Sequence, residues 1–206
     1  MTTSQVLTTL VGGLLFSLSL TAAIGAQNAF VIRQGIRRSH VGAVVAICAG
    51  SDAILITAGV AGVGSVLVGR RELMGAMRVL GAALLLTYAA LAARRAVRGV
   101  PGSSTRAPAA ASLKATVAAC LGFTWLNPNV YLDTVILLGS VANAHPTGRW
   151  WFTAGAILAS LTWFAALGFG TRLLAPLLSR PGAERLLDGF VAATMGVAAL
   201  RLALGG

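Results

Sequence analysis

The stretch that decides the fold is WLNPNVYLDT, from Trp125 to Thr134, because it places Asn127, Pro128 and Asn129 inside an otherwise apolar run. Proline removes one backbone donor, frees the carbonyl oxygen four residues earlier, and pushes the preceding residue away from helical geometry. Unpaired backbone groups are costly in hydrocarbon unless they line a cavity enclosed by protein. The stretch therefore predicts a membrane helix that is broken beside a polar cavity.

A second break is expected where Gly25, Ala26, Gln27 and Asn28 interrupt another apolar run. Asn127 follows Gly25 by 102 positions in a chain of 206 residues. Two broken spans half a chain apart are typical of transporters that are built from two structural repeats. We therefore predict helix breaks at Gly25, Ala26 and Pro128, and two halves with one pattern.

The composition is that of an integral membrane protein. Hydrophobic residues make up 57% of the chain and charged residues 10%, with a mean hydropathy of +0.84, whereas soluble domains carry roughly 25% charged residues. The formal net charge is +11, but the basic residues lie between apolar runs and are not interleaved with aromatic residues, so nucleic-acid binding is not expected. The arginine excess instead predicts orientation in the bilayer and contact with anionic lipid headgroups.

Six segments are long enough for a membrane span, which needs about 20 largely apolar residues. They lie near Val6–Ile32, Val41–Val68, Leu73–Ala93, Leu113–Val141, Trp150–Thr171 and Leu186–Leu204. The sixth is the weakest, because Asp188 and Arg201 leave it a short uncharged middle. An alternative with five spans stays open.

The basic residues predict the orientation of these spans. With six spans, eleven of the sixteen Lys and Arg residues fall on one side and five on the other. By the positive-inside rule the first side is cytoplasmic, so both termini face outward. Residues 94–112 read as a cytoplasmic linker between a first repeat, 1–93, and a second repeat, 113–206. Three spans in each half make the repeats inverted, and such transporters bind substrate near the midplane between discontinuous helices.

Small residues recur at every fourth position in two of the segments, at Gly42, Ala46 and Gly50 and again at Gly155 and Ala159. Such faces allow the backbones of membrane helices to approach closely. We expect these positions to lie at helix contacts.

Only two of the five acidic residues, Asp52 and Asp133, fall well inside apolar segments. Carboxylates within a membrane are functional candidates by default. If the helix resumes after Pro128, Asp133 lies on the same face as Asn129, four residues earlier. The alternative is a structural ion pair with an arginine near the end of a span.

The breaks also supply amide groups that suit the zwitterionic end of an amino acid, since helix N-termini favour a carboxylate and exposed carbonyls an ammonium group. These candidates are Gln27, Asn28, Asn127 and Asn129. Three aromatic residues, Trp125, Tyr131 and Trp163, are candidates for stacking on a cationic group. Hydrogen bonds between helices, for the amides, and plain packing, for the aromatics, are the alternatives.

Sequence motifs for other chemistry are missing. Cys48 and Cys120 have no CxxC or CxxH spacing, so we expect no metal site and no haem, and buried free thiols instead. The chain has no P-loop, no G-x-S-x-G and no H-E-x-x-H. We expect a protein that needs no cofactor and is not an enzyme.

Four ordered motifs resemble the LysE-type basic amino acid exporter family. They are GAQNAFVIRQGIRR from Gly25 to Arg38, SDAILITAG from Ser51 to Gly59, FTWLNPNVYLDT from Phe123 to Thr134, and TGRWWFTAGAILASLTWF from Thr147 to Phe164. The family's first break usually reads GPQN, whereas position 26 here is alanine. A less sharp first break is the expected effect of this departure.

The resemblance implies an exporter of L-lysine, L-arginine or both in the bacterial inner membrane, with Asp52 and Asp133 as the two motif aspartates. Export of a cation from a negative interior needs coupling, and without a nucleotide motif an ion gradient must supply it. Proton antiport is the hypothesis, in which a carboxylate holds a proton in one state and the substrate cation in the other. An exporter of neutral amino acids and a transmembrane thiol-disulfide carrier are the alternatives. The oligomeric state is left open.

Overall fold

The computed structural model describes residues 1–22, 25–63, 70–98, 112–178 and 181–204, and these residues form helices without strands. In chain order the elements are α1 (Thr3–Thr21), α2 (Ala26–Ile36), α3 (Val41–Val60), α5 (Arg71–Arg98), α6 (Leu113–Trp125), α7 (Pro128–Val130), the π-helix η1 (Tyr131–Leu138), α8 (Gly139–Asn143), α9 (Arg149–Leu178) and α10 (Pro181–Leu204).

Five helices in the described part of the chain are long and apolar enough to cross a membrane. They are Thr3–Thr21, Val41–Val60, Glu72–Val97, Arg149–Leu173 and Arg185–Leu204. The predicted all-α membrane class is thereby confirmed. The fourth predicted span is not one continuous helix, because α6 stops after 13 residues and is followed by the break.

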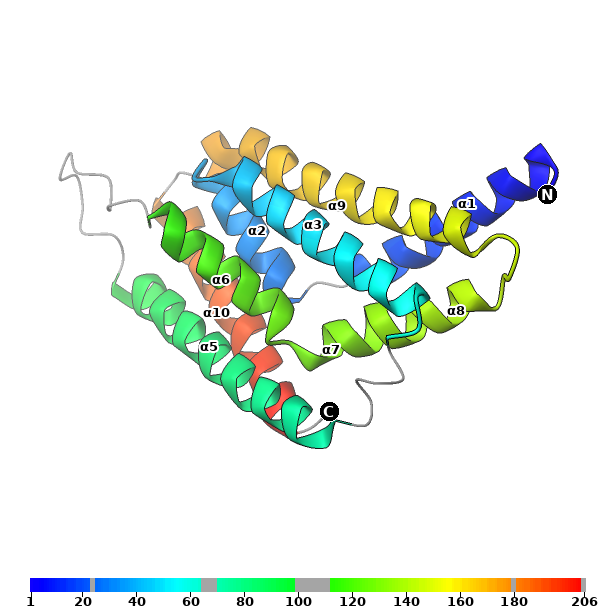
Figure 1. The fold of residues 1–206 in the computed structure, drawn as a ribbon. Coiled ribbons are helices and arrows are strands. Elements are labelled where there is room, and N and C mark those ends of the chain that lie inside the picture. Colours follow the sequence, from blue (N-terminus) through cyan, green and yellow to red (C-terminus); the bar gives the residue numbers. More distant parts are fainter. Residues whose placement is uncertain (23–24, 64–69, 99–111, 179–180, 205–206) are drawn as a thin grey trace.

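The helices form a bundle with two outer pairs, in which α1 packs on α9 and α5 packs on α10. Helices α2, α3 and α6 lie between these pairs (Figure 1). The broken segments, α1–α2 and α6–α8, run in opposite directions, and their breaks lie near the middle of the bundle (Figure 1). Both breaks therefore lie inside the bundle.

The first break comes between α1 and α2. Gly25 has an extended backbone, with φ −111° and ψ −176°, and stands immediately before α2. The side chain of Asn28 donates from Nδ2 to the carbonyl oxygen of Thr21 over 2.9 Å. This bond satisfies one of the carbonyl groups that the end of α1 leaves without a helical partner.

The second break follows from Pro128, which occupies the first position of α7. Asn127 before it is extended, with φ −101° and ψ 105°, as expected for a residue that precedes proline. Its side-chain oxygen accepts from the backbone N–H of Asn129 at 3.1 Å. The hydroxyl of Tyr131 donates to the carbonyl oxygen of Trp125 at 2.9 Å, so the end of α6 is also capped by a side chain.

A π-helix, η1, continues from this break over Tyr131–Leu138 and contains Asp133. Its hydrogen bonds join residues five positions apart, a rare arrangement that occurs frequently at functional sites. Nothing in the sequence pattern predicted it.

Several helix contacts in the described chain are so close that glycine is required, and two of them bear on the site. A Cβ atom on Gly155 would collide with the backbone of Leu10, which lies where α9 crosses α1. A Cβ on Gly59 would lie 2.5 Å from the carbonyl oxygen of Val135, where α3 crosses η1. The predicted contact at Gly155 is confirmed, but that at Gly42 and Gly50 is wrong, since nothing lies within 4 Å of a Cβ at either position.

One predicted boundary also needs correction. The second span was expected to reach Val68, but α3 ends at Val60, where Asn143 Nδ2 donates to the terminal carbonyl over 3.2 Å. Gly62 then takes a φ of +93°, a conformation that favours glycine. The predicted linker, 94–112, stays a prediction, because helix α5 continues through Arg98 and residues 99–111 lie outside the described chain.

Candidate functional site

The two breaks meet at a cavity of about 670 Å³, which is also lined by residues from α3, α5 and α10. It brings together most of the residues predicted to form the site. Those that line it are Gly25, Ala26, Gln27, Asn28, Asp52, Asn127, Asn129 and Asp133. Residues from both halves of the chain therefore share one cavity, and the polar groups of both breaks face it.

Pro128 and the aromatic candidates do not line this cavity but support its walls. Trp163 donates from Nε1 to Oδ1 of Asn28 at 3.4 Å, which ties α9 to the first break. Trp125 donates from Nε1 to the hydroxyl of Ser51 at 3.1 Å. Both tryptophans therefore contribute hydrogen-bond donors from the polar edges of their rings, and not a stacking face. The Tyr131 hydroxyl is likewise a donor at the second break.

Asp52 is a buried carboxylate in the wall of the cavity, with 8% of its surface exposed. Ser160 on α9 donates to its Oδ2 over 2.6 Å. Hydrogen bonds to a charged oxygen are stronger than neutral ones, so this bond fixes the position of the carboxylate. Ser160 was missed by the sequence reasoning, because a single serine in an apolar run gives no signal of its own.

Asp133 lies on η1 and lines the same cavity, but its side chain is exposed. The two carboxylates are therefore different in kind, since Asp52 is held by a neighbouring helix and Asp133 is accessible. Their different surroundings suit different roles for the two groups.

Gln27 supplies a hydrogen-bond donor that the described residues leave unused. Its Nε2 atom is buried and has no partner in hydrogen-bonding geometry. The Cys48 thiol lies near this amide, but sulfur is a weak acceptor. A buried donor without a partner costs about 1–3 kcal/mol, so an acceptor on a bound ligand would stabilise it.

Arg201 on α10 also lines the cavity, although the sequence reasoning treated it only as a charge near the end of the last span. The cavity wall therefore carries two carboxylates and one guanidinium group. The signal that could have found Arg201 was a lone cation inside an apolar segment.

Comparison with known proteins agrees with this architecture. The LysE type translocator family matches residues 18–206. The chain belongs to this family. Relatives from Mycobacterium bovis and from two strains of Mycobacterium tuberculosis, each named a "putative amino-acid transporter", are 49% identical over 189 residues, which cover 90% of this chain and 92% of theirs. No solved structure matches the chain. Family membership and the long apolar helices together make it a multi-pass membrane protein.

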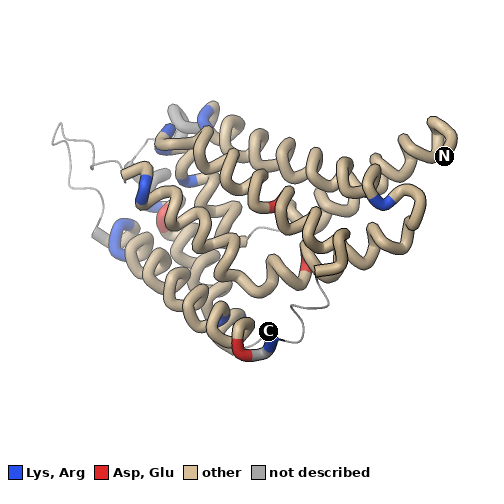
Figure 2. The backbone as a smooth tube through the Cα atoms, viewed as in Figure 1, with Lys and Arg blue, Asp and Glu red and all other residues tan. Residues whose placement is uncertain are grey.

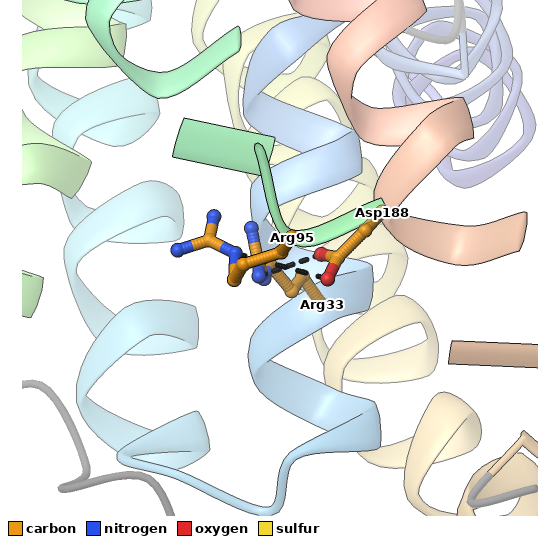
Figure 3. Close-up of polar contacts among 3 residues, drawn as sticks. All are labelled: Arg33, Arg95 and Asp188. Atoms are coloured by element: carbon orange, nitrogen blue, oxygen red, sulfur yellow. Dashed lines mark ion pairs between the residues drawn. The ribbon is translucent and has the colours of Figure 1, made fainter. Parts of the chain in front are cut away.

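This translocator has a second buried carboxylate besides Asp52, namely Asp188 on α10. It pairs with Nη2 of Arg33 on α2 at 2.6 Å and more loosely with Nε of Arg95 on α5 at 3.7 Å (Figure 3). The expectation that only Asp52 and Asp133 lie deep in the bundle is therefore wrong. Asp188 does not line the cavity, and its pairing depends on helix packing that the sequence does not display.

The two cysteines of the translocator lie side by side, with 3.3 Å between the sulfur atoms of Cys48 on α3 and Cys120 on α6. Both are free thiols with no exposed surface. Neither lines the cavity.

Proposed function

We propose that this translocator exports basic amino acids, L-lysine, L-arginine or both, across the bacterial cytoplasmic membrane by proton antiport with alternating access. The observation that carries the proposal is the cavity at the two breaks, which holds Asp52, Asp133 and Arg201 together. A basic amino acid carries two positive groups and one carboxylate. The charges of the cavity wall are complementary to all three.

The breaks themselves add groups for the zwitterionic end of the substrate. Helix α2 begins at the cavity with Ala26, and the N-terminus of a helix favours a negative group. The unused donor of Gln27 is a further partner for the substrate carboxylate. The side-chain cation of the substrate then lies toward the two aspartates.

We also propose that residues 1–93 and 113–206 form two inverted repeats, joined by the linker 94–112, and that the chain crosses the membrane six times. Contacts between elements support this assignment, because they occur in matching pairs. Packing of α1 on α9 matches that of α6 on α3, and packing of α2 on α9 matches that of η1 on α3. The broken segments α1–α2 and α6–α8 then correspond to each other as the first span of each repeat.

The sidedness of the proposal comes from the charges. Lys and Arg gather at the end of the bundle where α2 ends and α6 begins (Figure 2). By the positive-inside rule this end is cytoplasmic. The N-terminus of α1 lies at the opposite end (Figure 1).

Coupling to protons answers an energetic need. Moving one positive charge out of the cell costs roughly 2.3 kcal/mol for each 100 mV of membrane potential. A carboxylate can bind the substrate cation in one conformation of the protein and a proton in the other conformation. It then exchanges a proton for a substrate molecule in each cycle. Asp133 is the more accessible of the two for this exchange, and Asp52 the more firmly positioned.

Counterflow of labelled lysine and arginine in proteoliposomes, with a panel of competing amino acids, tests the proposal. Asp52→Asn and Asp133→Asn should each lower the rate about tenfold or more, because losing an interaction worth 1.4 kcal/mol already changes binding tenfold. Glu72→Gln is the matched control, since Glu72 is an exposed carboxylate away from the cavity. Normal export by both aspartate variants at normal expression would contradict the proposal, and equal competition by neutral amino acids would move the substrate to that class.

A thiol-disulfide carrier is the second candidate, and the contact between the Cys48 and Cys120 sulfurs favours it. Against it, both thiols are fully buried, whereas reactive thiols are partly exposed. The double variant Cys48→Ala, Cys120→Ala separates the two functions. Export should survive the change, whereas redox transfer across the membrane would be abolished.

A further inference from the structure

A buried ion-pair layer lies outside the cavity and joins three helices. Arg33 on α2 and Asp188 on α10 are 5% and 6% exposed and approach to 2.6 Å, and Arg95 on α5 approaches the same carboxylate (Figure 3). Helix α2 belongs to the first half of the chain and α10 to the second. The layer therefore connects the two halves.

A layer of aromatic rings lies on two of these helices, α2 and α5, and on α6. Phe30 on α2, Tyr88 on α5 and Phe123 on α6 contact one another in all three pairs, with ring centroids 5.0–6.0 Å apart. Phe30 is buried and Phe123 lines the cavity wall. These rings also connect the first half of the chain to the second.

The order of the layers follows from positions along the helices. On α2, Gln27 lines the cavity, Phe30 lies about one turn further on, and Arg33 about one turn beyond that. On α5, Leu84 and Leu85 line the cavity, and Tyr88 and Arg95 follow in the same order. The cavity, the rings and the ion pairs therefore succeed one another toward the end of the bundle where the basic residues gather (Figure 2).

We propose that Arg33, Asp188 and Arg95, together with Phe30, Tyr88 and Phe123, form a two-layer gate that closes the cavity toward the cytoplasm. Its role in transport rests on the proposed function, because an exported substrate has to pass it on the way from the cytoplasm to the cavity. Alternating access moves one repeat against the other. Contacts that join the halves on one side of the cavity break in that movement, and loss of Asp188 leaves a buried guanidinium group unpaired in the closed state.

Labelling of a cysteine placed in the cavity tests the gate. The background is Cys48→Ala with Cys120→Ala, and the reporter is Ala193→Cys, which is an exposed position in the cavity wall. A membrane-impermeant maleimide is added to inside-out and to right-side-out vesicles. With the gate intact, the reporter should react from the outside and poorly from the cytoplasmic side.

Asp188→Asn should raise the rate of cytoplasmic labelling about tenfold or more, since breaking a buried ion pair shifts a two-state equilibrium strongly. Arg95→Gln should raise the rate of cytoplasmic labelling less, because the distance from Arg95 to Asp188 is longer and the Arg95 side chain is partly exposed. The exchange Arg33→Asp with Asp188→Arg keeps two arginines and one aspartate, and should restore slow labelling. Arg172→Gln is the control, because Arg172 is an exposed cation on α9 that lies over the Phe169 ring.

The outcomes are separable. Unchanged cytoplasmic labelling in Asp188→Asn, with or without a lower melting temperature, would make the cluster a static structural contact and overturn the gate. If Asp188→Asn does not insert, Arg95→Gln decides by the same criterion. If Asp188→Asn raised the rate of labelling from the outside only, the assignment of the gate to the cytoplasmic side would also be overturned. Labelling requires no substrate, so the labelling experiment can support the gate even if the transport assay shows no export of basic amino acids. Equally, the transport assay can support export even if the labelling experiment contradicts the gate.

Discussion

At the scale of single residues, the first break forms at Gly25 without a proline. Gly25 is extended and stands just before α2, so Ala26 occupies the first helical position. The N–H groups of the first turn have no partner within a helix. The break therefore exists although the residue that usually enforces it in this family is absent.

Ala26→Pro should be tolerated, because proline is favoured at the first position of a helix and Gly25 already has the extended backbone that proline requires of its predecessor. Ala26 also lines the cavity, which leaves room for the ring. We expect an unchanged melting temperature in detergent and unchanged export. Ala29→Pro is the control: Ala29 donates to the carbonyl of Gly25 at 3.0 Å, and its replacement should cost about 3 kcal/mol or more. A large loss in Ala26→Pro would mean that α1 and α2 form a continuous helix in the membrane.

At the scale of elements, the second break is positioned by close packing of α3 against η1 and α8. Gly59 on α3 faces the backbone of Val135, and Gly139 at the start of α8 faces the backbone of Gly59. Backbone atoms cannot move aside as a flexible side chain can. This crossing therefore fixes the height of η1, and with it Asp133, relative to Asp52 on α3.

Gly59→Ala should lower stability by about 1–3 kcal/mol, the usual range for overpacking, and should also reduce export because η1 is displaced. Gly50→Ala on the same helix should be neutral or stabilise by up to about 1 kcal/mol, since alanine is the better helix former and the position faces open space. Thermal unfolding of both variants in one detergent gives the comparison. Equal stability of Gly59→Ala and Gly50→Ala would show that α3 and η1 are far enough apart to accommodate a Cβ atom at position 59.

At the scale of the whole molecule, the charge distribution defines two ends of the bundle, and the broken segment α6–α8 runs from one to the other (Figures 1 and 2). Neither part of this segment is long enough to cross alone, because α6 has 13 residues and the helical run formed by α7, η1 and α8 covers only residues 128–143. Its two parts together reach the length that a span needs.

Labels at the two ends of this segment should report opposite sides of the membrane. Lys114→Cys at the start of α6 and Thr147→Cys between α8 and α9 are both exposed, and the buried native cysteines are replaced by alanine. We expect an impermeant maleimide to react with the first only from the cytoplasm and with the second only from outside. Reaction of both from one side would mean that the broken segment re-enters without crossing, and that the chain crosses five times.

The sequence predicted the breaks and most of the cavity residues because polar groups inside apolar runs carry a strong local signal. It did not predict the pairing of Asp188 with Arg33, because residues on α10 and α2 meet only through packing of distant segments. The positions of small residues in the sequence do not show which of them lie at helix contacts. Gly50 faces open space, whereas Gly59 on the same helix touches η1. The π-helix has no periodic pattern that distinguishes it from an ordinary helix.

The π-helix η1 makes the number of residues after the second break as important as their identity. Successive residues of an α-helix turn by about 100°, whereas a helix closed by bonds between residues five apart is wider and turns less at each step. The face that Asp133 presents is therefore set by the count from Pro128 on one side and to Gly139 on the other. One residue more or fewer in this stretch would rotate the carboxylate relative to the glycine contact that anchors it, even with every motif residue retained.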